Sequence, residues 1–168
     1  MRKIWAAPFL LSGLLGAAVY PQSSDRPRPG LWENETWIKE ITWGNLTGER
    51  LAQAQALKAQ QQGKRTKSEE CLTPEEASSE HAGISLGQGD CTFSRFEMAG
   101  GTLRALGKCT GGPNGDVTSI IGGDYTPTSM ETNVDLSYEQ PGQPGGIGVK
   151  LFMVRKRIGE CPAQTNSG

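Results

Sequence analysis

The residues best suited to chemistry in this chain are four cysteines, and their spacing favours two disulfides over a metal site or a redox centre. They are Cys71, Cys91, Cys109 and Cys161. Zinc sites usually contain pairs of ligands two to four residues apart, and no two of these cysteines are that close. A thioredoxin-like redox site would need a Cys-x-x-Cys motif, which the sequence lacks. We therefore expect two disulfides, no metal and no cofactor.

A pair of glycines suggests which cysteines are joined. Cys91 lies nine residues before Gly100, and Cys109 lies eight residues after Gly101. A tight turn at the two glycines would place these cysteines almost opposite each other on strands about 5 Å apart, within disulfide range. Cys71 and Cys161 would then pair by default. A change of one residue in the turn would move Cys109 to the other face of its strand, so the remaining pairings stay open.

The sequence does not contain a convincing catalytic set, and we predict no catalytic residue. The single histidine, His81, would have to serve every Ser-His-Asp arrangement, and we expect it to be an exposed loop residue. Neighbouring carboxylates occur at Glu69-Glu70 and Glu75-Glu76, but adjacent helical residues do not face each other. Nothing singles out the two converging carboxylates that a glycosidase requires.

Two further groups of residues could contact a ligand. The basic triplet 155–157 could meet an anion, but we expect it to be a solvated strand edge that prevents pairing with another sheet. The large aromatic residues Trp32, Trp37, Trp43 and Tyr125 should pack in the core, and lining a ligand cavity inside a curved sheet is their alternative role.

The N-terminus has the features of a cleavable secretory signal. Arg2 and Lys3 precede an apolar stretch at 4–15, and the small residues 16–18 follow it. This order predicts cleavage after residue 18, with a slightly later cut as the alternative. The apolar stretch is shorter than the roughly 20 residues of a membrane-spanning helix. We expect an exported protein with no integral membrane span after cleavage.

The composition agrees with export and limits the class of partner. The chain has 17 basic and 18 acidic residues, and removal of Arg2 and Lys3 leaves 15 against 18, or about −3. A charge this small provides no field that would attract nucleic acid or anionic lipid. An even number of cysteines is typical of disulfides in an oxidising compartment. The 23 glycines and 10 prolines favour many turns between short strands.

The chain predicts one domain. We expect a flexible linker at 19–29, a single β-rich domain at 30–162 and a disordered tail at 163–168. A peripheral helix is expected at 48–62, followed by a charged connection at 63–70. A short helix should begin after Thr73, because Thr73, Pro74 and Glu76 form a capping-box pattern. Six strands are expected, at 31–43, 91–98, 102–109, 116–121, 129–138 and from 147 to the basic triplet 155–157.

Two of these strands alternate cleanly between apolar and polar residues. In the strand 129–138, one face carries Met130, Val134 and Leu136, and the other face is polar. The strand that begins at Ile147 alternates in the same way after a Pro/Gly turn at 139–146. One apolar and one wet face are typical of an antiparallel sheet. We therefore predict a mainly β fold, a curved antiparallel meander or half-barrel with one or two short peripheral helices and two disulfides.

Several short motifs, in this order, resemble a bacterial family. They are the segment 28–33, Cys-Leu-Thr-Pro-Glu at 71–75, the hairpin 91–109, Gly-Asp-Tyr at 123–125 and Arg-Ile-Gly-Glu-Cys at 157–161. Together they resemble the domain of unknown function 3617 family, which consists of exported proteins of Gram-negative bacteria. The resemblance implies a periplasmic location and no established activity, and it transfers no catalytic residue.

Two functions remain as hypotheses. The first is a non-enzymatic periplasmic module that binds or interacts with an envelope protein or a small apolar ligand. The alternative is a periplasmic hydrolase or redox enzyme with an unrecognised site, in which acidic residues and His81 would have to converge. The concave face of the sheet should distinguish them, since an apolar cup favours binding and two buried carboxylates favour catalysis.

Overall fold

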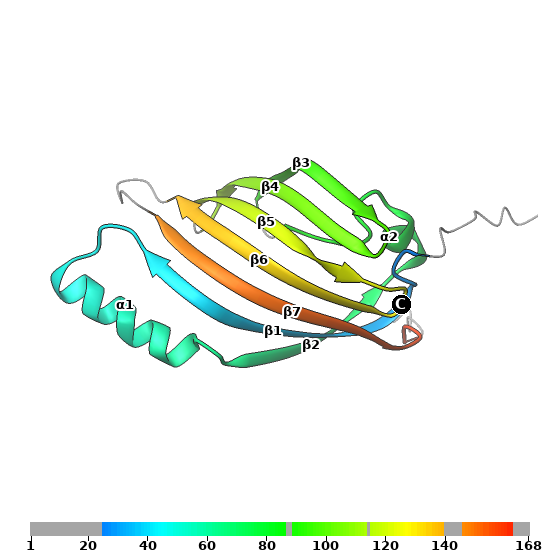
Figure 1. The fold of residues 1–168 in the computed structure, drawn as a ribbon, viewed down its shortest axis with the longest axis horizontal. Helices are drawn as coiled ribbons and strands as arrows, with labels where there is room; N and C mark the ends of the chain where they lie inside the picture. Colours follow the sequence, from blue (N-terminus) through cyan, green and yellow to red (C-terminus); the bar gives the residue numbers. More distant parts are fainter. Residues whose placement is uncertain (1–24, 87–88, 114, 140–145, 163–168) are drawn as a thin grey trace, which may run out of the picture.

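The computed structural model describes residues 25–86, 89–113, 115–139 and 146–162, which form one curved antiparallel sheet (Figure 1). The strands lie in the order β2-β1-β7-β6-β5-β4-β3 and the sheet is open at its two edges, β2 and β3. The elements are β1 (Gly30–Trp43), α1 (Gly48–Gln61), β2 (Arg65–Leu72), α2 (Pro74–Ser78), β3 (Asp90–Ala99), β4 (Thr102–Gly112), β5 (Gly115–Tyr125), β6 (Ser129–Glu139) and β7 (Ile147–Gly159). The predicted fold, a mainly β curved antiparallel meander or half-barrel with one or two short helices and two disulfides, is confirmed: the sheet is open and has two helices.

Four expectations fall wholly or partly on residues outside this description. The signal peptide at 1–18, residues 19–24 of the linker, residues 140–145 of the Pro/Gly turn and the tail at 163–168 are not among the described residues. The rest of the linker contacts the domain: the Arg26 side chain donates a hydrogen bond to the Glu80 carbonyl, and the Arg28 amide donates one to the Pro127 carbonyl.

Strand β1 lacks a clean alternation because a bulge interrupts it. Its register with β7 shifts between Ile38 and Glu40. A bulge adds one residue, so the residues after it exchange faces. Trp32 and Ile41, an even and an odd position, are therefore both buried.

The connection expected at 63–70 is wrong, because most of it forms the edge strand β2. Arg65–Leu72 pairs antiparallel with β1, from Trp37 opposite Arg65 to Gly30 opposite Leu72. All of its residues except Leu72 are exposed. A strand rich in Arg, Lys and Glu does not show the apolar alternation by which strands are predicted from sequence. Such charged side chains are nevertheless typical of an edge strand that must not pair with another chain.

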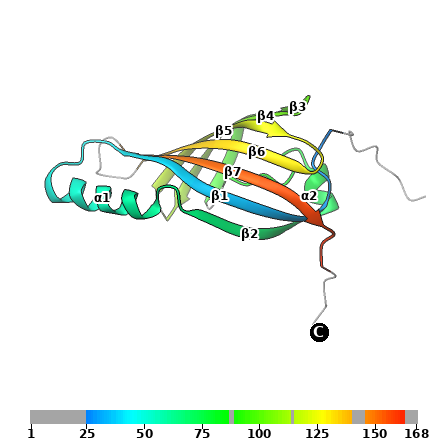
Figure 2. The same cartoon turned by 60° about the horizontal axis from the view of Figure 1, so that its bottom comes forward.

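Both helices form where the sequence predicts them, at opposite ends of the molecule (Figures 1 and 2). Helix α1 has no buried residue, in agreement with a peripheral position. Its C-terminal end is attached to β1 by the Gln62 side chain, which donates to the Lys39 carbonyl. Helix α2 has the complete capping box, in which the Thr73 hydroxyl accepts from the Glu76 amide and the Glu76 carboxylate accepts from the Thr73 amide.

The β3–β4 hairpin turns at Gly100 and Gly101, both of which have positive φ. Two such residues in succession form the tight turn whose twist matches that of the flanking strands. Ala99 pairs with Thr102 directly beside the turn. An undisturbed register from this pair would place Cys109 opposite Thr92.

A second bulge corrects this register. It lies between Phe93 and Arg95. No residue of β4 lies opposite Ser94, and Cys91 therefore lies opposite Cys109. These two cysteines form a disulfide, and the other disulfide joins Cys71 to Cys161. The first staples the β3–β4 edge, and the second ties the end of β2 to the chain that follows β7.

Candidate functional site

The concave side of the sheet contains a cavity of about 340 Å³. This volume is at the lower end of the roughly 300–1,000 Å³ that small-molecule sites occupy. Most of the wall is apolar and comes from alternate positions of the four strands β4 to β7. These apolar residues are Leu103, Ile121, Met130, Val134, Leu136, Leu151 and Met153. The alternation predicted for β6 and β7 is therefore what forms the wall.

The loop before β3 covers part of the cavity. Ala82 and Gly83 both have positive φ, which turns the chain back over the sheet, and Ile84 and Leu86 line the cavity. Leu86 lies against Gly107 on β4, where the Cβ of a larger residue would overlap the leucine side chain. The absence of a side chain at Gly107 therefore allows Leu86 to cover the concave face.

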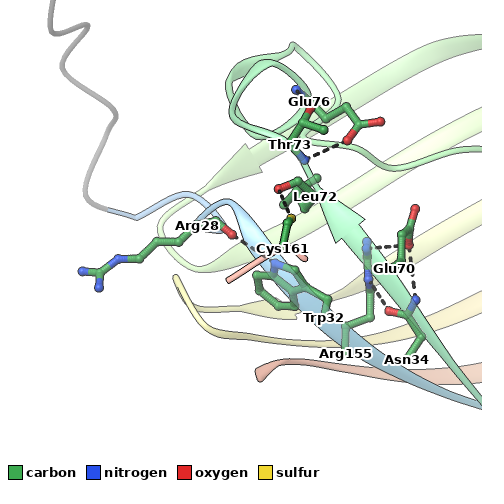
Figure 3. Close-up of polar contacts among 9 residues, drawn as sticks. All are labelled: Arg28, Trp32, Asn34, Glu70, Leu72, Thr73, Glu76, Arg155 and Cys161. Atoms are coloured by element: carbon green, nitrogen blue, oxygen red, sulfur yellow. Dashed lines mark hydrogen bonds and ion pairs between the residues drawn. The ribbon is translucent and has the colours of Figure 1, made fainter. Parts of the chain in front are cut away.

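One end of the cavity is polar and is organised around a buried arginine (Figure 3). Arg155 on β7 is only 7% exposed. Its Nε donates to Asn34 Oδ1 at 2.8 Å, and its Nη2 donates to Glu70 Oε2 at 2.9 Å. Asn34 Nδ2 donates to the same Glu70 oxygen at 3.2 Å, which closes a triangle across β1, β2 and β7.

The electrostatics of this triangle are asymmetric. Burial lowers the pKa of the Arg155 guanidinium, and the nearby Glu70 carboxylate partly opposes this effect. An arginine nevertheless remains protonated in proteins, so the cavity contains a permanent positive charge. The Glu70 side chain is 54% exposed, and water therefore screens its charge far more than that of Arg155.

The expectation that residues 155–157 form a solvated strand edge is wrong for Arg155. Strand β7 lies between β1 and β6, so it is not an edge. Arg155 continues the inward series of Leu151 and Met153, and this alternation was the available signal. Arg157 is also engaged, since it donates to the Pro29 carbonyl and pairs with Glu160.

Ser119 on β5 is a second polar group in the cavity, and the sequence did not indicate it. The residue is 1% exposed, and its hydroxyl has no hydrogen-bond partner within the described part of the chain. A buried polar group without a partner is unusual in native proteins, and each case calls for an explanation. Ser119 is among the residues that line the cavity, but its hydroxyl oxygen is itself buried.

His81 is not the exposed loop residue that we expected. It is half-buried, and its ring packs against Phe93 at 4.4 Å and Phe96 at 5.0 Å between centroids. The sequence could not show this contact, because it joins a loop to a strand that follows it. His81 is not among the residues that line the cavity.

The four aromatic residues considered for the cavity lie elsewhere. Trp32 packs with Leu72 and donates from Nε1 to the Arg28 carbonyl, and Tyr125 belongs to the core cluster around Leu103. Trp37 packs against Phe152 with the two rings tilted, and Trp43 is the last residue of β1. None of the four is among the residues that line this cavity.

The arrangement can hold an apolar body and offer hydrogen bonds at its polar end, around Arg155. Glu70 is the carboxylate among the lining residues, and its Oε2 accepts from both Arg155 and Asn34. Within the described ranges, no group of three or more His, Cys, Asp or Glu side chains could hold a metal ion. Over the same residues, no helix is long and apolar enough to cross a bilayer.

The comparisons with known proteins give a family and nothing beyond it. No curated protein matches this chain, and no solved structure does. The sequence model of the family described as "Protein of unknown function (DUF3617)" matches residues 27–161, which include every strand of the sheet and all four cysteines. The chain therefore belongs to the DUF3617 family, as its motifs suggested.

Proposed function

We propose that this protein is exported to the periplasm and works there as a non-enzymatic binding module that holds a small, largely apolar ligand in the concave cavity. The observation that carries the proposal is the cavity itself, which has apolar walls from four strands and a polar end at Arg155. Ligand sites in proteins commonly combine a mostly apolar wall with a few placed polar groups.

The carboxylate and the histidine support binding over catalysis. A hydrolase would bring a general acid or base to a reacting atom inside a cleft. Glu70 is already paired with Arg155 and is half exposed, while His81 packs against two phenylalanines. What the cavity offers is apolar surface and hydrogen bonds, which suit a carrier or a sensor of a small molecule.

Export is supported by the predicted signal peptide and by the two disulfides. Disulfides persist in oxidising compartments such as the periplasm and are rare in the cytoplasm. Expression of the full chain in a Gram-negative host, followed by intact mass measurement of the periplasmic fraction, tests this part. We expect a protein that has lost residues 1–18 and has no free thiol. A chain that keeps residues 1–18 in the cytoplasm would contradict it.

Native mass spectrometry of the protein purified from periplasm tests the binding role. We expect a stoichiometric small molecule that disappears after the protein is unfolded in urea and refolded. Val134→Trp should abolish the bound molecule, because Val134 lies in the middle strand of the apolar wall and a larger side chain would fill the cavity. The matched control is Asp135→Trp, since Asp135 is exposed on the opposite face of β6. Repeated absence of a bound molecule from the unmodified protein would refute the proposal.

A further inference from the structure

The cavity is elongated, and its two unusual polar groups lie at opposite ends of it. On β6 the lining residues run from Met130 to Leu136, a separation of six residue steps or about 20 Å of strand. Arg155 pairs with Met130 on one side of β6, and Ser119 pairs with Leu136 on the other. The cavity wall therefore extends from Arg155 to Ser119 and Leu136, and the polar Thr132 lies on β6 between them.

The cavity is open along the edge strand β2. Ser68 and Glu70, which line the cavity there, belong to the edge strand β2 and are exposed. Leu103 on β4 and Ser119 on β5, across the sheet from β2, are almost completely buried. A molecule that enters from the edge of β2 would keep its polar group near Arg155 and place its apolar part along β6.

Arg155 has donors to spare for such a molecule. A guanidinium carries five N–H groups, and the hydrogen bonds of Arg155 within the described chain start from Nε and Nη2. Glu70 is the opposing charge, but its exposure weakens its effect on a buried group. The Arg155–Glu70 pair is neutral as a whole, so the unused N–H donors of Arg155 are what should favour an anionic head group over a cationic one.

We propose that the cavity binds a single-chain anionic amphiphile, with its head group on Arg155 and its chain along β6 towards Ser119. The inference rests on the proposed binding function and specifies its ligand. A free fatty acid and a single-chain phospholipid share this chemistry, because carboxylate and phosphate oxygens both match the guanidinium fork. The apolar chain would replace water along the wall formed by β4 to β7.

Isothermal titration of ligand-free protein with probes of one chain length tests the head group. Decanoate and decylammonium, kept below their micelle concentrations, differ in the sign of the head charge. A charge-assisted hydrogen bond in a buried site should make decanoate bind at least about tenfold tighter. Affinity should also rise about fourfold per methylene from octanoate to decanoate, as expected for burial of the chain.

Two variants test whether Arg155 causes the preference for decanoate over decylammonium. The double substitution Arg155→Met with Glu70→Gln removes both charges, so no unpaired charge remains. In it the preference for decanoate over decylammonium should fall below threefold. Lys156→Met is the matched control, since Lys156 is the next residue, is exposed and should leave the preference unchanged. If the double variant does not fold, the comparison of head groups on the unmodified protein still decides.

The outcomes separate this inference from the proposed function. Equal binding of the two probes, or tighter binding of decylammonium, would leave a binding module but overturn the anionic head group. Failure of both probes and of 1-decanol to bind would count against the apolar-ligand function itself. Titration with decanoyl-lysophosphatidylglycerol identifies the head group of the ligand. Tighter binding than that of decanoate would indicate a phosphate head group, and weaker binding would indicate a carboxylate.

Discussion

Replacement of Ser119 by alanine should stabilise the ligand-free protein, although most substitutions of buried residues do the opposite. The Ser119 hydroxyl is buried and has no partner among the described residues. A buried polar group that lacks its hydrogen bond destabilises the fold by roughly 1–3 kcal/mol. The change to alanine removes this penalty and only one non-hydrogen atom, so we expect a gain of about 1 kcal/mol. For a domain of this size, that gain would raise Tm by about 3–5 °C.

Urea unfolding with intact disulfides measures this change. The midpoint should rise at an unchanged m-value, because the area exposed on unfolding stays the same. Ser137→Ala is the control: Ser137 is exposed on β6, and its replacement should change stability by less than about 0.5 kcal/mol. A loss of 1 kcal/mol or more in Ser119→Ala would show that the hydroxyl has a partner.

Three further changes test the fold. Gly123→Ala should destabilise the protein by about 2–3 kcal/mol in urea unfolding, because its Cβ would overlap the backbone of β6, whereas Gly122→Ala meets no atom and should be nearly neutral. Deletion of Ser94 should remove the bulge of β3 and still leave the hairpin disulfide in place; free thiols in a mass-spectrometric assay would contradict the register. The ion pair with Lys150 lowers the pKa of Glu40 and raises that of Lys150. The unmodified protein should therefore be more stable than Glu40→Gln at pH 7. This difference in stability should vanish as the pH falls through the pKa of Glu40 in the folded protein, and a difference that persists in strong acid would refute the pairing.

The structure also shows why some predictions from the sequence succeeded. The capping box at Thr73, the turn at Gly100-Gly101 and the alternation of β6 depend on residues close together in the chain. Local hydrogen bonds and the two-residue period of a strand fix such features without help from distant segments. The cysteine pairing was only partly predictable from local sequence. The glycine turn suggested it, but the bulge at Ser94 sets the register that places Cys91 opposite Cys109.

Sequence by itself determined the mainly β fold, the curved antiparallel sheet with two disulfides and the inward-facing apolar residues of β6 and β7. Tertiary structure decided the site. The charged segment of β2 became a strand because β1 offered it a partner, and the pairing of β1 with β7 placed Arg155 in the middle of the sheet. Ser119 and the loop residues 83–86 line the cavity because segments distant in the sequence come into contact. Burial and charge at these positions depend on which strands become neighbours, and a pattern within one strand does not contain that information.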